Sequence, residues 1–441
     1  MRTLLIELRR SAALWTGGLT LVLALVLLYG FPGPWAKGAE DWTEEWTNLA
    51  RWLRYHLMLL WPVALAAGAW QGRRDHRSKM DELLATVPRP AVLRVLPPVL
   101  AMCIGLVGAY LVLFLVGAVQ VIGNTSFNDF GWVPILLVGF LSLIAGALVG
   151  MGIGRVLPFV LTAPVLGVAG LVAMVVTSIG SPGTGSNIAG SVSQQVALLG
   201  PALENARNAF DTIATMVSVL QMVWFVALGL TGFALFALSG FSGRQARLLA
   251  PLPVIVGAAI VLPLLPSRPD QVVIRDTEAV ALVCAPGAPR VCVSRLHEDQ
   301  LDELATPARE VLAALARLPA PQPTSVVESM RSRNISGPPG DLSPDVIYAQ
   351  LDDFEFTADS RRTMLAGPEQ NCPESDYAAD MARRAVIASW FDGELAGVRK
   401  SRPMPPDVAA RAESLWQSLR SLPADQQAAR VAGLRAQAYR C

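Results

Sequence analysis

Long uncharged apolar runs, separated by short charged loops, make up residues 1–266 of this chain, whereas residues 267–441 have the mixed pattern of a water-soluble domain. The hydrocarbon core of a bilayer is about 30 Å thick and requires about 20 apolar helical residues to cross it. We expect seven runs to be membrane-spanning helices: 12–31, 56–71, 95–122, 132–153, 157–179, 214–239 and 249–266. The pattern therefore predicts a polytopic α-helical membrane protein with a C-terminal soluble domain.

Basic residues in the loops indicate on which side of the membrane each loop lies, because positive charge in short loops marks the cytoplasmic side. Three arginines precede residue 11, and the loop after the second run is rich in Arg and Lys, whereas the alternate loops contain almost none. Arg51 and Arg54, beside the second run, are exceptions. Seven spans then predict a multi-pass plasma-membrane protein with a cytoplasmic N-terminus and an extracytoplasmic domain over residues 267–441.

Cysteine usage agrees with an extracytoplasmic domain, since four of the five cysteines lie in residues 267–441. An even number of cysteines in an oxidising compartment suggests two disulfides, with three possible pairings. Cys284 and Cys292 flank an Ala-Pro-Gly-Ala-Pro turn, so a hairpin bridge is plausible and would leave Cys372 to pair with Cys441. Unpaired structural thiols are the alternative. A four-cysteine zinc site is less favoured, because the sequence contains no C-x₂-C pair.

The soluble part has the pattern of a mixed α/β domain, with short apolar runs and longer amphipathic segments. We expect strands at 272–274, 279–283, 291–293 and 325–327, and helices at 298–317, 376–396, 405–421 and 424–438. Its one histidine, His297, belongs to no H-E-x-x-H pattern, and no G-x-S-x-G turn is present. We therefore predict no catalysis and no metal in this domain, and binding of a cargo or a partner instead.

The composition changes the picture in two respects. Only 16% of the chain is charged and the formal net charge is +1, without a basic tract, so we expect the lipid bilayer and no nucleic acid as a partner. The predicted spans contain no Asp, Glu, Lys or Arg, which argues against proton- or sodium-coupled transport. The chain also has no G-x-x-x-x-G-K-[ST] sequence, so any ATPase must be a separate subunit.

The loop after the second span is where such a subunit could act. Apolar residues at helical spacing alternate there with charged ones, and Pro88 and Pro90 end the pattern. A short amphipathic helix that docks in a partner and a solvated interfacial turn are equally compatible with this pattern. The apolar positions are Met80, Leu83, Leu84 and Val87.

Residues 80–89, M-D-E-L-L-A-T-V-P-R, resemble the coupling-helix region of ABC-2 type transporter permeases, where a stretch of the form E-x-L-L-A-T-P-x-x-R follows the second span. Val87 is an insertion relative to that pattern. Residues 1–10 are similar to the family's interfacial elbow helix. The resemblance implies a six-span core over residues 11–240, and residues 241–266, the seventh span, and the soluble domain are additions to it.

The resemblance also implies partners. Such a permease dimerises with an identical or a different copy and works with cytoplasmic ABC ATPase subunits, which bind ATP and Mg²⁺, while this chain binds no cofactor. We expect an export function, with ATPase contacts at Asp81, Glu82, Leu83 and Leu84 and supporting charges at Arg73, Arg74 and Arg77. The alternative is a membrane receptor or scaffold whose extracytoplasmic domain binds a ligand and signals to a cytoplasmic protein.

Two further segments outside the predicted spans have a recognisable pattern. Trp42, Trp46, Leu49 and Leu53 form one helical stripe, which predicts an amphipathic helix in the outer interface or a simple aromatic anchor. Residues 181–213 begin rich in Ser and Gly and then become apolar, which is compatible with a re-entrant piece or with a flexible loop.

Overall fold

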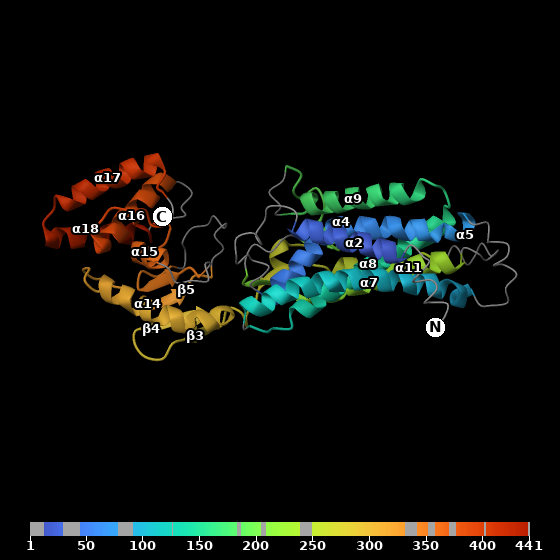
Figure 1. Cartoon of the computed structure of the whole chain (residues 1–441), viewed down its shortest axis with the longest axis horizontal. Helices are drawn as coiled ribbons and strands as arrows, with labels where there is room; N and C mark the ends of the chain where they lie inside the picture. Colours follow the sequence, from blue (N-terminus) through green and yellow to red (C-terminus); the bar gives the residue numbers. More distant parts are fainter. Residues whose placement is uncertain are drawn as a thin grey trace. The chain divides into compact units, whose positions relative to one another are not determined.

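The chain divides into two compact units (Figure 1). The computed structural model describes residues 13–29, 45–77, 91–125, 127–182, 187–203, 209–238, 249–330, 342–351, 358–369, 376–400 and 403–439. The helical unit comprises residues 1–124 and 128–275, and the α/β unit comprises residues 125–127 and 276–441. The change of unit at Arg275 lies close to the change in composition that the sequence shows near residue 267.

Each of the seven predicted spans coincides with a helix of the helical unit, and the long helices run alongside one another in Figure 1. These helices are α2 (Ala13–Tyr29), α4 (Trp46–Gly72), α7 (Ala91–Asn124), α8 (Trp132–Val156), α9 (Thr162–Gly180), α11 (Thr215–Leu238) and α13 (Leu252–Leu264). Among the described residues, α7, α8, α9 and α11 are long and apolar enough to cross a membrane, whereas α2 and α13 are shorter apolar helices. Seven crossings remain a prediction.

Helix α4 differs from its prediction, because it begins at Trp46 rather than at residue 56. The predicted second span and part of the predicted interfacial stripe are one continuous helix of 27 residues. This helix also contains Arg51 and Arg54, which precede the uncharged predicted span 56–71, and both are buried. The reason is structural, since both side chains find hydrogen-bond acceptors inside the unit.

Glycines set the distance between α4 and α8. A Cβ atom added at Gly68 of α4 would lie 2.1 Å from the carbonyl oxygen of Ala147, and one added at Gly150 of α8 would lie 2.1 Å from the carbonyl oxygen of Leu65. Gly72 and Gly154 repeat these contacts one turn further along. The two backbones therefore touch, as in the small-xxx-small packing of membrane helices.

Short elements complete the helical unit. The one-turn helix α10 (Gln194–Ala197) lies between α9 and α11, and α5 (Arg74–Arg77) follows α4. Strand β1 (Asp211–Ile213) pairs antiparallel with β2 (Val273–Arg275), which follows the 3₁₀ turn η1 (Pro269–Gln271). A strand was expected near 272–274, but its partner is in the helical unit and not in the sheet of the soluble domain.

The α/β unit contains one four-stranded sheet among its described residues, with the order β3-β4-β5-β6. Strands β3 (Leu282–Cys284) and β4 (Arg290–Ser294) form a hairpin, and β5 (Ser325–Glu328) and β6 (Val346–Ala349) join it in parallel. The helical elements are η2 (Arg295–Gln300), α14 (Leu301–Leu315), α15 (Ala358–Ala366), α16 (Tyr377–Asp392), α17 (Pro406–Arg420) and α18 (Ala424–Gln437). Strand β6 and helix α15 were not expected from the sequence, whereas the other segments agree with it.

The core of the α/β unit lies between the sheet and these helices. Val291 of β4, Val326 of β5 and Ile347 of β6 are buried in one apolar cluster with residues of α14, α16, α17 and α18. Helix α14 contacts both β4 and β5, and its buried positions recur at helical spacing, as in any crossover helix that covers a sheet. The mixed α/β prediction for this part of the chain is therefore confirmed.

Candidate functional site

The end of α4 leads through the one-turn helix α5 (Arg74–Arg77) toward the predicted coupling segment. Arg73 caps this helix and is buried, and its Nη1 donates a hydrogen bond of 3.1 Å to the carbonyl oxygen of Phe159. The guanidinium groups of Arg73 and Arg77 lie 4.9 and 5.5 Å from the centre of the Trp70 ring. Arg73 therefore ties the end of α4 to the connection between α8 and α9.

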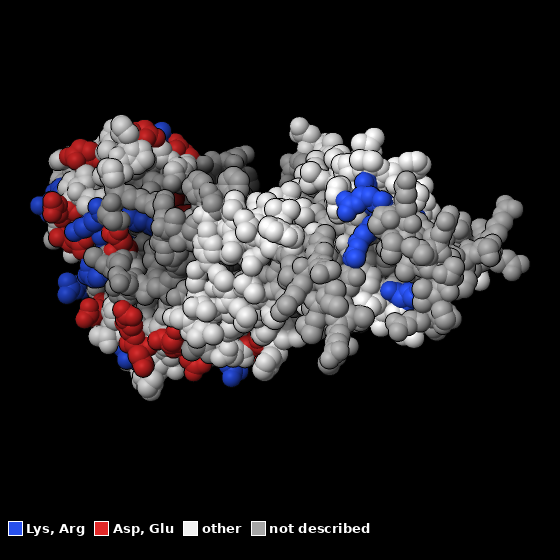
Figure 2. Space-filling view, turned by 45° about the vertical axis from the view of Figure 1, so that its right-hand side comes forward, with Lys and Arg blue, Asp and Glu red and all other residues white. Residues whose placement is uncertain are grey.

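Other basic residues lie near this connection. Arg155, in the last turn of α8, places its guanidinium 5.0 Å from the centre of the Phe236 ring, and Arg74 belongs to α5. Figure 2 shows the helical unit mostly uncharged on the face in view, with Lys and Arg toward one end, whereas charges of both signs cover the α/β unit. The predicted ATPase contacts Asp81, Glu82, Leu83 and Leu84 lie outside the described residues.

A buried arginine occupies the opposite half of α4. Arg54 is fully buried, and its Nε and Nη2 donate to the carbonyl oxygen of Pro201 at 3.0 and 2.7 Å. Its Nη1 donates to Oε1 of Gln221 on α11 at 3.1 Å, and Nε2 of Gln221 donates to the carbonyl oxygen of Leu198 at 2.7 Å. Arg54 and Gln221 thus join two helices to the turn that follows α10.

Two further side chains hold the same segment. Trp224 of α11 donates from Nε1 to the carbonyl oxygen of Leu199 at 3.0 Å, and Arg51 donates from Nη1 to the carbonyl oxygen of Asp211 at 2.8 Å. We call Arg51, Arg54, Gln221 and Trp224 the latch residues. Within the predicted re-entrant segment, the turn after α10 and the first residue of β1 are therefore bound through their own carbonyl groups.

The remaining members of the predicted interfacial stripe lie inside the helical unit. The Trp46 ring stacks on Trp132 with 5.6 Å between ring centres, and its Nε1 donates to Oδ1 of Asn128 at 2.9 Å. Leu49 and Leu53 are fully buried in the core of this unit. The stripe therefore packs against other helices rather than forming a separate helix in the interface, and Trp42 lies outside the described residues.

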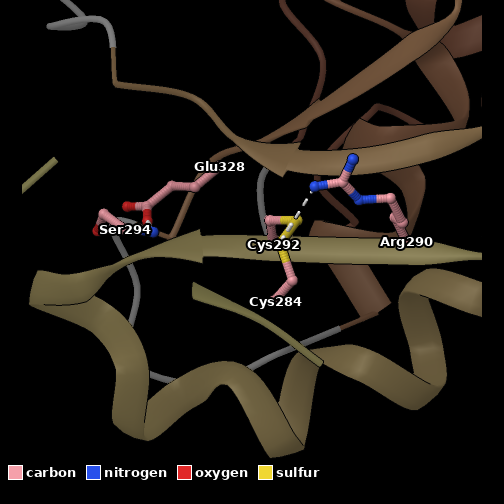
Figure 3. The surroundings of a disulfide bond; sticks show 5 residues. All are labelled: Cys284, Arg290, Cys292, Ser294 and Glu328. Atoms are coloured by element: carbon pink, nitrogen blue, oxygen red, sulfur yellow. Dashed lines mark hydrogen bonds between the residues drawn. A yellow bond between two sulfur atoms is a disulfide. The ribbon is translucent and has the colours of Figure 1, made fainter. Parts of the chain in front are cut away.

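The disulfide expected for the soluble domain is present. Cys284 and Cys292 are opposite each other in the β3–β4 hairpin and are joined by an S–S bond (Figure 3). Nη2 of Arg290 lies 3.8 Å from the Sγ atom of Cys284. This pairing confirms the hairpin bridge, whereas Cys372 and Cys441 lie outside the described residues.

A serine, a histidine and a carboxylate come together next to this hairpin. Oε1 of Glu328 lies 2.5 Å from Nδ1 of His297, and Oγ of Ser294 lies 3.5 Å from the same nitrogen. The backbone N–H of Ser294 also donates to Oε2 of Glu328 at 2.6 Å, and Figure 3 shows this carboxylate turned toward Ser294. A serine hydrolase places serine and carboxylate on different ring nitrogens. Here the serine hydroxyl and the carboxylate both lie beside Nδ1 of His297, so the group does not have the arrangement of a catalytic triad. Its hydrogen bonds instead join β4 to β5.

The described residues contain no group of three or more His, Cys, Asp or Glu side chains that could hold a metal ion. Comparisons with protein-family models, curated proteins and solved structures found no match to this chain. The case for a function therefore rests on the residues themselves.

The latch residues were missed in the sequence, although two arginines three positions apart beside an apolar run are a signal that could have found Arg51 and Arg54.

Proposed function

We propose that this chain is the membrane-spanning permease subunit of an ATP-driven ABC exporter. Separate cytoplasmic ATPase subunits would act on residues 73–90, and a second permease copy would complete the translocation path. The observation that carries this proposal is the ABC-2-like sequence of residues 80–89, which follows α4 and the one-turn helix α5 along the chain.

The packing of α4 supports such a role because it allows this helix to transmit a displacement from one end to the other. Its 27 residues extend over about 40 Å. One end is fastened through Arg73 to the α8–α9 connection, and the glycine contacts join its second half to α8. A force applied just beyond Gly72 would therefore move the second half of α4 together with α8.

The latch residues give that movement a second effect. Arg51 and Arg54 lie near the start of α4, and they hold the turn after α10 and the first residue of β1. A shift of α4 at its coupling end would displace the donors that bind this segment at the other end. ATP-driven closure would thus reach the proposed exit side of the membrane through one continuous helix.

The orientation follows from the same proposal. A cytoplasmic coupling segment requires residues 73–90 inside the cell, and alternation of seven helices then brings the α/β unit outside the cytoplasm. The disulfide between Cys284 and Cys292 supports this placement, because disulfides form and persist in oxidising compartments.

The test is ATPase association with the full chain in lipid nanodiscs. Each ATPase with Walker motifs encoded beside this gene is assayed for co-purification and for ATP hydrolysis with the wild-type chain, with Glu82→Arg and with Glu303→Arg as a control. We expect Glu82→Arg to abolish both signals and Glu303→Arg, an exposed change of the same kind in the α/β unit, to leave them unchanged. Equal association of both variants, or no association of the wild-type chain, would overturn the proposal.

A second candidate function is a membrane receptor, and one observation favours it. The α/β unit encloses a cavity of about 460 Å³, within the usual size range of small-molecule sites. A receptor would bind its ligand without nucleotide turnover. Ligand-dependent recruitment of a cytoplasmic protein in the absence of any ATPase would therefore favour this alternative.

A further inference from the structure

The cavity of the α/β unit lies beyond the carboxyl ends of two parallel strands. Ser329, which follows β5, and Gln350, which follows β6, both line it. Most of the remaining lining residues belong to the segment after α15, to α16 and to the segment that leads into α17. In open α/β sheets, ligands bind outside the carboxyl ends of the parallel strands. The position of the cavity in the fold is therefore that of a ligand site.

Among the described residues, the charged groups that line the cavity carry one excess positive charge. They are Arg384, Arg399 and one carboxylate, that of Glu369. Nη1 of Arg384 donates to Oε1 of Glu369 at 2.6 Å, but Nε of Arg384 has no hydrogen-bond partner in the described part of the chain. The Arg384 side chain is only 4% exposed, whereas that of Glu369 is 48% exposed. The buried arginine is thus only half satisfied, by a carboxylate that solvent can reach.

Arg399 supplies the second cation. It is half-buried on the cavity wall, and within the described ranges it forms no ion pair. Its position is held by its neighbours, because Nε of the buried Arg362 donates to the carbonyl oxygen of Gly397 at 3.0 Å and Nη2 donates to that of Ala396 at 2.9 Å. Arg362 also pairs with Asp392, so the wall beside Arg399 is fixed before any ligand arrives.

A third guanidinium group lies behind the wall at Gly367. This glycine lines the cavity at φ +84°, and a Cβ added to it would lie 3.7 Å from Nε of Arg435. Arg435 is buried, and its Nε and Nη2 have no hydrogen-bond partner among the described residues. Burial lowers the pKa of Arg435 from its ordinary value, and the nearby Tyr439 raises it to a lesser extent. Arg435 does not itself line the cavity, but it adds a cation behind this wall.

Apolar side chains form much of the remaining lining, including Met381, Val398, Met404 and Val408. Methionines adapt their shape to a bound apolar group. One excess positive charge suits a monoanion, since a dianion would be left with a charge that Glu369 repels. A planar guanidinium binds a carboxylate through two parallel N–H···O bonds.

We infer that the cavity of the α/β unit is a binding site for a small organic carboxylate with an apolar body. The carboxylate pairs with Arg384 and Arg399, and the apolar body lies against Met381 and Met404. The cavity volume of about 460 Å³ accommodates a molecule of this kind. The inference concerns only the α/β unit, so it holds whether or not the helical unit is a permease.

The test uses 4-phenylbutyrate as the probe and the full chain in lipid nanodiscs. Heats of binding are measured by titration calorimetry, and those of empty nanodiscs are subtracted because the probe partitions into lipid. The neutral 4-phenylbutyramide has the same body without the charge, and inorganic phosphate has charge without the body. We expect saturable binding of the carboxylate, and binding of the amide and of phosphate weaker by about tenfold or more, since a hydrogen bond to a charged group contributes roughly 1.5–3 kcal/mol.

Three variants separate binding from folding. Arg399→Gln removes a half-buried cation and should weaken the carboxylate by about tenfold or more. Glu369→Gln removes the competing carboxylate and should tighten the probe by roughly threefold to tenfold, a gain that damage to the fold would not produce. Arg430→Gln, an exposed change of the same kind on α18, should leave binding unchanged.

Each opposite result overturns the inference. Equal affinity for the acid and the amide would show that charge plays no part. No heat from 4-phenylbutyrate up to millimolar concentration, or equal effects of Arg399→Gln and Arg430→Gln, would show that these arginines bind no such carboxylate. Weaker binding by Glu369→Gln would show that this carboxylate supports the site rather than competing in it.

Discussion

Replacement of Arg54 by methionine tests whether the buried arginine of α4 holds the helical unit together. Methionine has a similar length and apolar stem but no donors. In the structure, the guanidinium group gives three hydrogen bonds, two to the carbonyl oxygen of Pro201 and one to Gln221. No carboxylate pairs with it in the described part of the chain, so its charge is balanced only by these dipoles.

The magnitude follows from what the substitution leaves behind. Two buried acceptors, the carbonyl oxygen of Pro201 and Oε1 of Gln221, lose their donor, and each such loss costs roughly 1–3 kcal/mol. The desolvation of the guanidinium no longer opposes folding, which offsets part of that loss. We expect a net decrease of about 2–4 kcal/mol in the free energy of unfolding. The stability of Arg54→Lys should lie between that of the wild-type protein and that of Arg54→Met, because an ammonium group cannot reproduce the planar arrangement of donors in a guanidinium group.

The assay is SDS titration of the purified chain in mixed micelles, followed by the circular dichroism of its helices. Gln221→Leu and the double variant complete a double-mutant cycle with Arg54→Met. We expect a coupling energy of about 1–2 kcal/mol, because the two side chains are in direct contact. Arg268→Met, the same chemical change at an exposed position of the helical unit, serves as the control.

Two results would refute this reasoning. Additive effects of Arg54→Met and Gln221→Leu would mean that the two side chains do not stabilise each other. A variant Arg54→Met that is as stable as the wild-type protein would mean that the desolvation of the guanidinium costs as much as its hydrogen bonds contribute.

Three further predictions concern the packing, the caps and the disulfide. Gly150→Leu should force α4 and α8 apart and destabilise the helical unit by about 1–3 kcal/mol, whereas Gly108→Leu, where nothing lies within 4 Å, should be tolerated; Trp fluorescence during SDS titration measures both. Hydrogen bonds from Arg411 and from backbone N–H groups lower the pKa of Asp376, so its contribution is present above the ordinary pKa and lost as pH falls through the lowered one. Asp376→Ala should therefore lower the unfolding temperature at pH 7 and have no effect in strong acid, and an equal decrease at both pH values would contradict this cause. Cys284→Ser should destabilise the α/β unit by at most about 2.5 kcal/mol, because the bridge spans only eight positions and closes a short loop. Reducing agent should lower the unfolding temperature of the wild-type protein to that of the variant.

The positions of the helices were largely predictable because apolar runs of this length have few other stable conformations. The start of α4 was not, since Arg51 and Arg54 were placed beside the second apolar run, which was expected to begin at residue 56. Their burial depends on carbonyl groups near Pro201 and Asp211, more than 140 residues away along the chain. Local sequence contains no information on a partner at that distance.

In the α/β unit too, local features were predictable from the sequence and contacts between distant residues were not. The hairpin and its Cys284–Cys292 bridge were predictable because both strands and the turn between them are local. Strand β6 is only four residues long, Val346–Ala349, and becomes a strand because β5 offers it a free edge. The cavity was not visible in the sequence at all, since residues such as Ser329, Arg384 and Arg399 meet only after the sheet and its helices have formed.

The sequence by itself determined where the chain is apolar and where it is water-soluble, where most of the helices lie, and that Cys284 and Cys292 flank one turn. These properties depend on neighbours within a few residues, where periodicity and composition act. Tertiary structure alone decided that the arginines of α4 lie inside the unit, that Gly68 and Gly150 bring two backbones into contact, and that Arg384 and Arg399 line one cavity. Burial of a charge and contact between backbones depend on which distant groups become neighbours, and only the folded chain brings those groups together.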